Sequence, residues 1–364
     1  MSTASTSSAS LEAAAQQASD ALDQHVREIV AWHFSPETGT PFWLDWAKQV
    51  GWDPASEVQS FADIARFPHF EDDWLRYEPH ERFVPRAFEG KPFTIFETGG
   101  TTGMPKQRIG WEDYKTDYEQ FSDRLDDKHF PPGEHWLMIG PTGPRRLRLA
   151  IEHLANHRGS SCYFIDLDPR WVKKLIAAKQ FDQAKAYMEH VIDQALIILK
   201  HRKVSALFTT PKLLEALAEK VSLPEAGIKG AFVGGTTMTP QYVRFLVEEI
   251  LEGEVGFYPT YGNTLMGLAG HKPLEAADQF SITYYAPQPR AVLRVVDPET
   301  DEPVAYDTWG RVELTTLTKE LFLPRFLERD EAMRRRPCPQ YPWDGVGEVR
   351  PFGQSKQAIV EGVY

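Results

Sequence analysis

The stretch FETGGTTGMPKQ, residues 96–107, combines three glycines, three threonines and a lysine behind a short apolar run. A backbone that approaches phosphate oxygens closely needs glycine, and successive exposed N–H groups there form an anion-binding nest that threonine hydroxyls extend. We therefore predict a phosphate-binding loop made by the seven residues Thr98, Gly99, Gly100, Thr101, Thr102, Gly103 and Lys106. An ordinary glycine–threonine turn is the alternative interpretation.

The loop differs from the Walker pattern of nucleotide hydrolases. Lys106 follows Gly103 by three residues and is followed by Gln107 rather than by Ser or Thr. The Walker loop needs a hydroxyl directly after its lysine to hold magnesium, so this class is excluded.

Short apolar runs alternate with amphipathic segments on both sides of the loop. This alternation over residues 91–270 predicts α/β subdomains that bind a nucleotide. The expected strands are residues 93–97, 136–140, 162–166, 206–210, 231–234 and 256–259, and the expected helices begin near Glu112, Arg145, Asp182, Lys212 and Pro240. Thr239 before Pro240 predicts a helix cap followed by proline in the first turn.

The flanking segments differ from this central part. Residues 1–90 contain a helical pattern at 10–34 followed by tryptophan- and proline-rich sequence, and we expect them to pack on the core. Residues 271–364 contain the runs RAVLRVVD (290–297) and GRVELTTL (310–317), which predict a hairpin-rich β portion.

Composition excludes several classes of protein. The 364 residues carry a formal net charge of −12, which argues against a general nucleic-acid or anionic-membrane binder. Only two cysteines are present, so no disulfide framework is expected, and the predicted location is the cytoplasm. No uncharged run approaches the roughly 20 apolar residues of a membrane span.

Four motifs in order along the chain resemble the acyl-adenylate-forming superfamily of AMP-dependent synthetases and ligases, in its phenylacetate-CoA ligase-like branch. The motifs are TGGTTGMPK (98–106), FVGGTTM (232–238), YPTYGNTLMG (258–267) and GRVELTTLTKELFLPRFLERD (310–330). The resemblance implies two α/β subdomains and a small β portion, equivalent to the large N-terminal domain of these enzymes. It also implies ATP and AMP as ligands.

The resemblance assigns roles residue by residue. Residues 98–106 would hold the β- and γ-phosphates and Thr264 the α-phosphate, with Lys106 and Thr264 as the catalytic residues. The adenine would lie against Gly234, Gly235, Thr236 and Tyr261, beside Gly262 and Asn263. Asp330 would hold the ribose, with Asp344 as the competing candidate, and the acid substrate would contact Gly140, Gly143, Arg145 and Thr237.

Two departures from the family pattern affect the expected chemistry. Leu265 stands where the family has a magnesium-binding glutamate, so we expect no metal ligand there and leave magnesium use open, with Asn263 as a weak substitute. The sequence also ends at Tyr364, near the hinge beyond which family members carry a lysine-bearing C-terminal domain. We therefore expect that domain to be absent and Lys106, Arg145, Arg146 and Arg148 to compensate in part for its lysine.

The length and the YGNT element are similar to the C-terminally truncated adenylating enzyme of phenazine antibiotic pathways. The resemblance implies ATP-dependent activation of an aromatic carboxylic acid for an acyl-accepting enzyme or carrier, in antibiotic or other secondary metabolism. Two alternatives stay open: a nucleotide- or acid-binding protein with little turnover, and an acyl-protein synthetase that uses Cys338.

Overall fold

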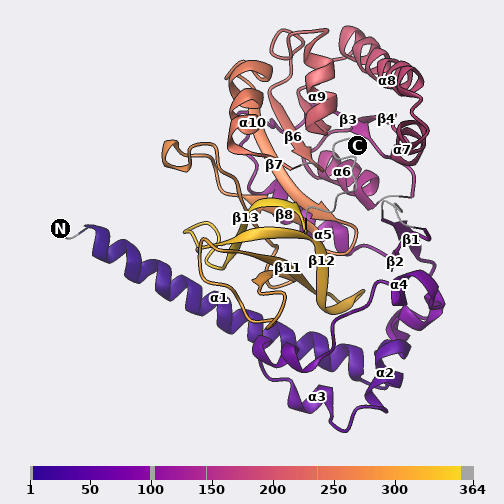
Figure 1. Cartoon of the computed structure of the whole chain (residues 1–364), viewed down its shortest axis with the longest axis vertical. Helices are drawn as coiled ribbons and strands as arrows, with labels where there is room; N and C mark the ends of the chain where they lie inside the picture. Colours follow the sequence, from indigo (N-terminus) through magenta and orange to yellow (C-terminus); the bar gives the residue numbers. More distant parts are fainter. Residues whose placement is uncertain (1–2, 99–102, 145, 236, 354–364) are drawn as a thin grey trace. The chain divides into compact units, whose positions relative to one another are not determined.

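The structure is a computed structural model that describes residues 3–98, 103–144, 146–235 and 237–353 (Figure 1). Its described residues form two compact units. The first consists of residues 3–96, 106–113 and 283–353, and the second of residues 97–98, 103–105, 114–144, 146–235 and 237–282. Each unit combines helices with a β-sheet, so the chain is an α/β protein, as the alternating pattern predicted.

The second unit contains a parallel sheet in the strand order β4-β3-β5-β6-β7, extended by β8, which pairs with β7 in the antiparallel sense. The strands are β3 (Trp136–Gly140), β4 (Cys162–Asp166), β5 (Ala206–Thr209), β6 (Gly230–Gly234), β7 (Gly256–Asn263) and β8 (Gly267–His271). Leu137, Met138 and Ile139 in the middle of β3 have no exposed surface, which is typical of a parallel strand covered on both faces.

Helices connect these strands (Figure 1). They are α5 (Asp113–Ser122), α6 (Arg146–His157), α7 (Pro169–Ala177), α8 (Phe181–His201), α9 (Pro211–Ala218), α10 (Pro240–Phe245), the π-helical turn η4 (Leu246–Ile250) and the short helix η5 (Ala276–Asp278). The expected start at Pro240 is confirmed, and the Thr239 hydroxyl accepts a hydrogen bond from the backbone N–H of Tyr242 at 3.3 Å. Capping by a threonine side chain satisfies a backbone donor that the first helical turn leaves free.

The first unit packs helices against an antiparallel sheet in the order β10-β11-β12-β13-β9. Its strands are β9 (Thr283–Tyr285), β10 (Ala291–Val296), β11 (Trp309–Leu317), β12 (Phe322–Arg335) and β13 (Gly345–Pro351). Its helices are α1 (Thr3–Phe34), α2 (Pro41–Ala47), α3 (Pro54–Glu57), α4 (Trp74–Tyr77), η1 (Phe61–Arg66), η2 (His80–Phe83) and η3 (Arg86–Phe88). The predicted hairpin of residues 290–317 is present, with Val292 opposite Thr315.

One expected strand belongs to a different sheet. Residues 93–97 were expected in the α/β sheet, but in the described part of the chain β1 (Thr94–Glu97) pairs with β2 (Gln107–Gly110) in a small two-stranded sheet. The physical reason is that a second strand begins directly after the glycine–threonine loop, so the loop connects two neighbouring strands instead of a strand and a helix.

The core of the first unit is rich in aromatic side chains. Trp43, which is 1% exposed, lies with its ring centroid 5.1 Å from that of Phe322 on β12, and its indole N–H donates to the Phe322 carbonyl at 3.1 Å. These contacts attach the tryptophan-rich N-terminal segment to the antiparallel sheet.

No helix among the described residues has both the length and the apolar composition needed to cross a membrane.

Candidate functional site

A cavity of about 250 Å³ lies in the second unit, at the carboxyl ends of its parallel strands. Pro141 follows β3, Thr210 follows β5, and Gly235 follows β6. Ligands of α/β sheets bind at this edge, where the chain leaves each strand. The lining is completed by Thr98, Tyr118, Arg146, Leu147, Ala150, Pro169, Phe208, Phe232, Gly234, Thr260, Gly262, Asn263, Thr264, Gly267 and Leu268.

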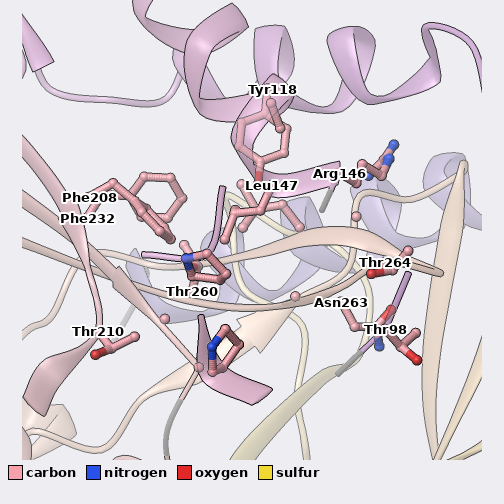
Figure 2. Close-up of a pocket in the computed structure, with 18 residues that line it drawn as sticks. Thr98, Tyr118, Arg146, Leu147, Phe208, Thr210, Phe232, Thr260, Asn263 and Thr264 are labelled. Atoms are coloured by element: carbon pink, nitrogen blue, oxygen red, sulfur yellow. The ribbon is translucent and has the colours of Figure 1, made fainter. Parts of the chain in front are cut away.

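One end of the cavity is apolar. Phe208 of β5 and Phe232 of β6 meet edge to face, with ring centroids 4.9 Å apart. Figure 2 shows these two rings on one side of the cavity and Leu147 of α6 above its centre. Ala150 and Leu268 add further apolar surface. Walls of this kind suit a planar apolar ligand group.

The other end is polar. Figure 2 shows Thr98, Asn263 and Thr264 gathered on the side away from the two phenylalanines. The Thr264 hydroxyl donates to the backbone carbonyl of Glu97 at 3.4 Å, which links the end of β7 to the start of the glycine–threonine loop. The cavity is therefore amphipathic along its length.

A buried ion pair contributes to the cavity wall through Arg146. Arg146 Nη2 lies 3.0 Å from Asp117 Oδ2, and the two side chains are only 4% and 3% exposed. Gly267, with φ +106°, passes so close that an added Cβ would lie 2.9 Å from Asp117 Oδ2 and 3.0 Å from Arg146 Nη1. Because the carboxylate neutralises the guanidinium, this wall carries no net charge toward the cavity.

Tyr118 contributes a hydroxyl to the same cavity from α5. Its side chain is 3% exposed, and Figure 2 shows it reaching from the helix toward Leu147. Burial raises the pKa of Tyr118, with Arg146 lowering it and Asp117 raising it further. The phenol therefore stays protonated at neutral pH and can donate or accept a hydrogen bond.

The structure brings six of the predicted site residues to the cavity. They are Thr98, Gly234, Gly235, Gly262, Asn263 and Thr264, which come from three of the four motifs. Gly103, Gly140, Gly143, Thr237 and Tyr261 are in the same unit but do not line this cavity. Gly99, Gly100, Thr101, Thr102, Arg145 and Thr236 lie outside the described residues.

Tyr261 is separated from the cavity by the geometry of its strand. Thr260 and Gly262 line the cavity, whereas Tyr261 between them pairs with Ala269 of β8. Successive side chains of a strand point to opposite faces, so the Tyr261 ring leaves β7 on the face opposite the cavity. A ligand group stacked on this ring would not occupy the cavity itself.

Lys106 and Asp330 belong to the first unit. Lys106 Nζ lies 3.1 Å from Asp72 Oδ1 and 4.5 Å from the centroid of the Phe326 ring. Burial raises the pKa of Asp72, but Lys106, Arg76 and Arg329 outweigh it, so that pKa lies below its usual value. Lys106 is therefore held as a partly buried cation.

The two candidate ribose carboxylates differ in their surroundings. Asp330 lies on β12 opposite Pro351 of β13. Asp344 binds Arg334 Nη2 at 2.7 Å and accepts the Tyr306 hydroxyl at 2.9 Å. Asp344 is thus part of a polar cluster within the first unit.

The turn after β7 does not fit magnesium at the position that the resemblance marks. Leu265 is 1% exposed and has no oxygen to offer. Asn263 Oδ1, the weak substitute, accepts the backbone N–H groups of Leu265 and Met266 at 2.8 Å each. A carbonyl oxygen has two lone pairs, so this oxygen is fully used in shaping the turn.

Some residues of the cavity had no role in the sequence-based prediction. Tyr118, Phe208, Phe232 and Leu147 lie within expected helices or strands, where their pattern indicates only core positions. Arg146 was named only as a compensating cation, and its partner Asp117 comes from another helix. Only the folded structure shows which of the apolar side chains line a cavity instead of packing in the core.

No protein-family model and no curated protein sequence matches this chain. Solved structures do match it. A 2-hydroxyisobutyryl-CoA ligase in an open conformation, in complex with 2-HIB-AMP and CoA, aligns with a TM-score of 0.64 and 16% identity over 92% of this chain and 69% of that chain. The same ligase in its thioesterification state, also with 2-HIB-AMP and CoA, aligns with a TM-score of 0.63 and 17% identity over 92% and 68%. The chain therefore has the α/β fold of these ligase structures, which is the fold expected for the large N-terminal domain of adenylate-forming enzymes.

Proposed function

We propose that this protein activates an aromatic carboxylic acid with ATP, forming the acyl-adenylate and pyrophosphate. The observation that carries the proposal is the amphipathic cavity, whose polar end is formed by Thr98, Asn263 and Thr264 from two of the recognised motifs. An aromatic acid has the same polarity, with a carboxylate at one end and an apolar ring at the other. The ring would lie between Phe208, Phe232 and Leu147.

In the proposed reaction a carboxylate oxygen attacks the α-phosphorus of ATP. The new bond joins this oxygen to the α-phosphorus, and the bond from the α-phosphorus to the bridging oxygen breaks, so that pyrophosphate leaves with that electron pair. Negative charge develops on the phosphoryl oxygens, and nearby cations and hydrogen-bond donors stabilise it. In our assignment these groups are the loop of residues 98–106, Lys106 and the Thr264 hydroxyl.

The nucleotide would lie outside the cavity, on the other side of β7. Tyr261, which leaves the strand on that opposite face, would stack on the adenine. Gly234, Gly235 and Gly262 line the cavity, so their backbones, with Thr236 beside them, would form the boundary between the acid and the adenine. Asp330 would bind the ribose. Gly140, Gly143, Arg145 and Thr237 would surround the acid as it enters.

The cavity volume bears on the size of the acid. A cavity of about 150 Å³ holds benzene, so the 250 Å³ here suits a substituted ring or two fused rings. A three-ring phenazine acid is larger than this, so it marks the upper limit of the proposed class. We further propose that the activated acid passes to an acyl-accepting enzyme or carrier in secondary metabolism, and that the reaction takes place in the cytoplasm.

Exchange of radiolabelled pyrophosphate into ATP tests the reaction, because it requires the adenylation step to run backwards. The acids would be benzoate, a quinoline carboxylate, a phenazine carboxylate and the aliphatic 2-hydroxyisobutyrate, each with and without magnesium. We expect exchange that depends on an aromatic acid. Exchange only with the aliphatic acid would overturn the aromatic assignment.

A matched pair of variants tests the nucleotide site. Asp330→Asn should weaken ATP binding by about tenfold or more, since it removes a charged hydrogen-bond acceptor from the ribose. Asp344→Asn is the control, because Asp344 already binds Arg334 and Tyr306. Equal loss in both variants would contradict the assignment of Asp330.

Binding without turnover is the second candidate function. The buried Leu265 and the occupied oxygen of Asn263 favour it, because the turn after β7 lacks the oxygen ligand that would hold magnesium there. In that case calorimetry would detect binding of ATP or of the acid, while no acid in the panel would support exchange.

A further inference from the structure

We propose that the Tyr118 hydroxyl is the specificity determinant of the cavity and selects acids that carry a hydrogen-bonding substituent on the ring, away from the carboxylate. This inference rests on the proposed function, since it takes the cavity to be the site of the acid. The substituent would be a phenolic hydroxyl, a carbonyl or a ring nitrogen.

The first argument concerns the hydrogen bonds of the other polar side chains that line the cavity. Thr260 Oγ1 donates to the Val233 carbonyl at 3.1 Å, and Thr210 Oγ1 accepts the backbone N–H of Leu213 at 3.5 Å. Arg146 is paired with Asp117. Within the described part of the chain, the Tyr118 hydroxyl has no hydrogen-bond partner.

The second argument is the energetic consequence of that position. Tyr118 is 3% exposed, and Figure 2 shows its phenol near Leu147, with Arg146 to one side. The hydroxyl faces the cavity, so a ligand that fills the cavity encloses it. Leaving an enclosed hydroxyl without a partner is costly. A ligand substituent that binds the hydroxyl removes this cost, whereas an apolar ring of the same shape does not.

The third argument excludes an anionic substituent. Among the described residues that line the cavity, Arg146 is the cation, and Asp117 at 3.0 Å already neutralises it. Placing a second carboxylate or a sulfonate at the apolar end would therefore bury an uncompensated charge. The expected substrate is thus a monocarboxylic aromatic acid whose second polar group is neutral.

The orientation follows from the ends of the cavity. Thr98, Asn263 and Thr264 mark the polar end in Figure 2, and Tyr118 lies apart from them, across Leu147. The carboxylate must reach the α-phosphate at the polar end for adenylation. The Tyr118 hydroxyl then faces the part of the ring that points away from the carboxylate.

Matched pairs of acids test the inference, with 4-hydroxybenzoate against benzoate and a quinoline carboxylate against the corresponding naphthoate. In at least one pair, we expect the protein to prefer the acid with the polar substituent over its apolar counterpart by about tenfold, in both pyrophosphate exchange and acid binding. Tyr118→Phe should bring this ratio close to one while leaving binding of the apolar acid intact. A merely structural role would lower binding of both acids and leave the ratio unchanged.

Tyr114→Phe is the matched control. Tyr114 is on the same helix one turn earlier, is also buried, and does not line the cavity. This variant should keep the wild-type ratio. Melting curves of the two variants establish that both are folded.

The outcomes separate this inference from the proposed function. If the protein supports exchange with the polar and the apolar acid equally, or if Tyr118→Phe keeps the preference for the polar acid, the role of Tyr118 is overturned and adenylation stands. If the protein binds the polar acid more tightly but supports no exchange, the role of Tyr118 is supported and adenylation is overturned. Absence of acid binding by every member of the panel overturns both.

Discussion

Replacing Gly267 with alanine should destabilise the second unit through the ion pair at the cavity wall. At φ +106° an alanine is strained, and its Cβ would lie 2.9 Å from Asp117 Oδ2 and 3.0 Å from Arg146 Nη1. Both distances are shorter than ordinary van der Waals contact. Because the two side chains are 3% and 4% exposed, neither can move into solvent to make room.

The expected loss has two parts. Forcing an L-residue into the left-handed region costs about 1–2 kcal/mol. Separating a buried ion pair costs about 3 kcal/mol or more, because each charge is left without its partner in a medium of low polarity. We therefore expect Gly267→Ala to lower the free energy of unfolding by about 4–5 kcal/mol.

Gly103→Ala separates the two parts. Gly103 has the same φ of +106°, and nothing in the described structure lies within 4 Å of an added Cβ, so this variant carries only the backbone cost. At about 2–4 °C per kcal/mol for a unit of this size, Gly267→Ala should melt about 6–12 °C below Gly103→Ala in scanning calorimetry. Melting temperatures within 2 °C of each other would refute the close packing of Gly267 against the pair.

Four further predictions concern pH, the phosphate loop and the two cysteines. Burial lowers the pKa of His33 and of His271 to about 4, whereas the unfolded chain takes up these protons near pH 6.5. The free energy of unfolding should therefore fall as the pH decreases from 6.5 toward 4, by about 2 kcal/mol per histidine at pH 5. A urea unfolding midpoint that is the same at pH 7 and pH 5 would contradict this. Lys106→Met should slow pyrophosphate exchange by about a hundredfold to a thousandfold. Asp72→Asn keeps the Lys106 cation and should retain most of the rate. Equal losses in both variants would assign Lys106 a structural role. Cys338→Ala should leave product formation unchanged, and a large loss would favour acyl transfer through this thiol. Burial raises the pKa of Cys162 to about 12, so Cys162 should resist alkylation by iodoacetamide at pH 8, as followed by mass spectrometry.

Local pattern was sufficient for much of the second unit. The expected strands at residues 136–140 and 162–166 have the same bounds as β3 and β4, because each is built on a short apolar run, residues 136–139 and 162–165, that a glycine or an aspartate follows. The cap at Thr239 was equally local, since it depends on the residue types at 239 and 240 alone. By contrast, α7 after the Asp168–Pro169 start was not expected, although its cap is of the same kind.

The role of strand 93–97 depended on a partner. Its composition predicts a strand correctly, but the sheet that it joins is decided by the residues that return beside it, which are those of β2. Pairing is a contact between segments, and nothing in the short run itself specifies it.

The sequence by itself determined the chemistry that this chain offers: a glycine–threonine loop with its lysine, the GGTT and YGNT segments and two candidate carboxylates. Residue type and spacing are sufficient there, because backbone access and donor type are local properties. Only the tertiary structure decided that Tyr118, Phe208 and Phe232 line the same cavity, and that Asp117 neutralises Arg146 on its wall. These contacts join residues of different helices and strands. They depend on how the elements pack, so no local sequence pattern predicts them.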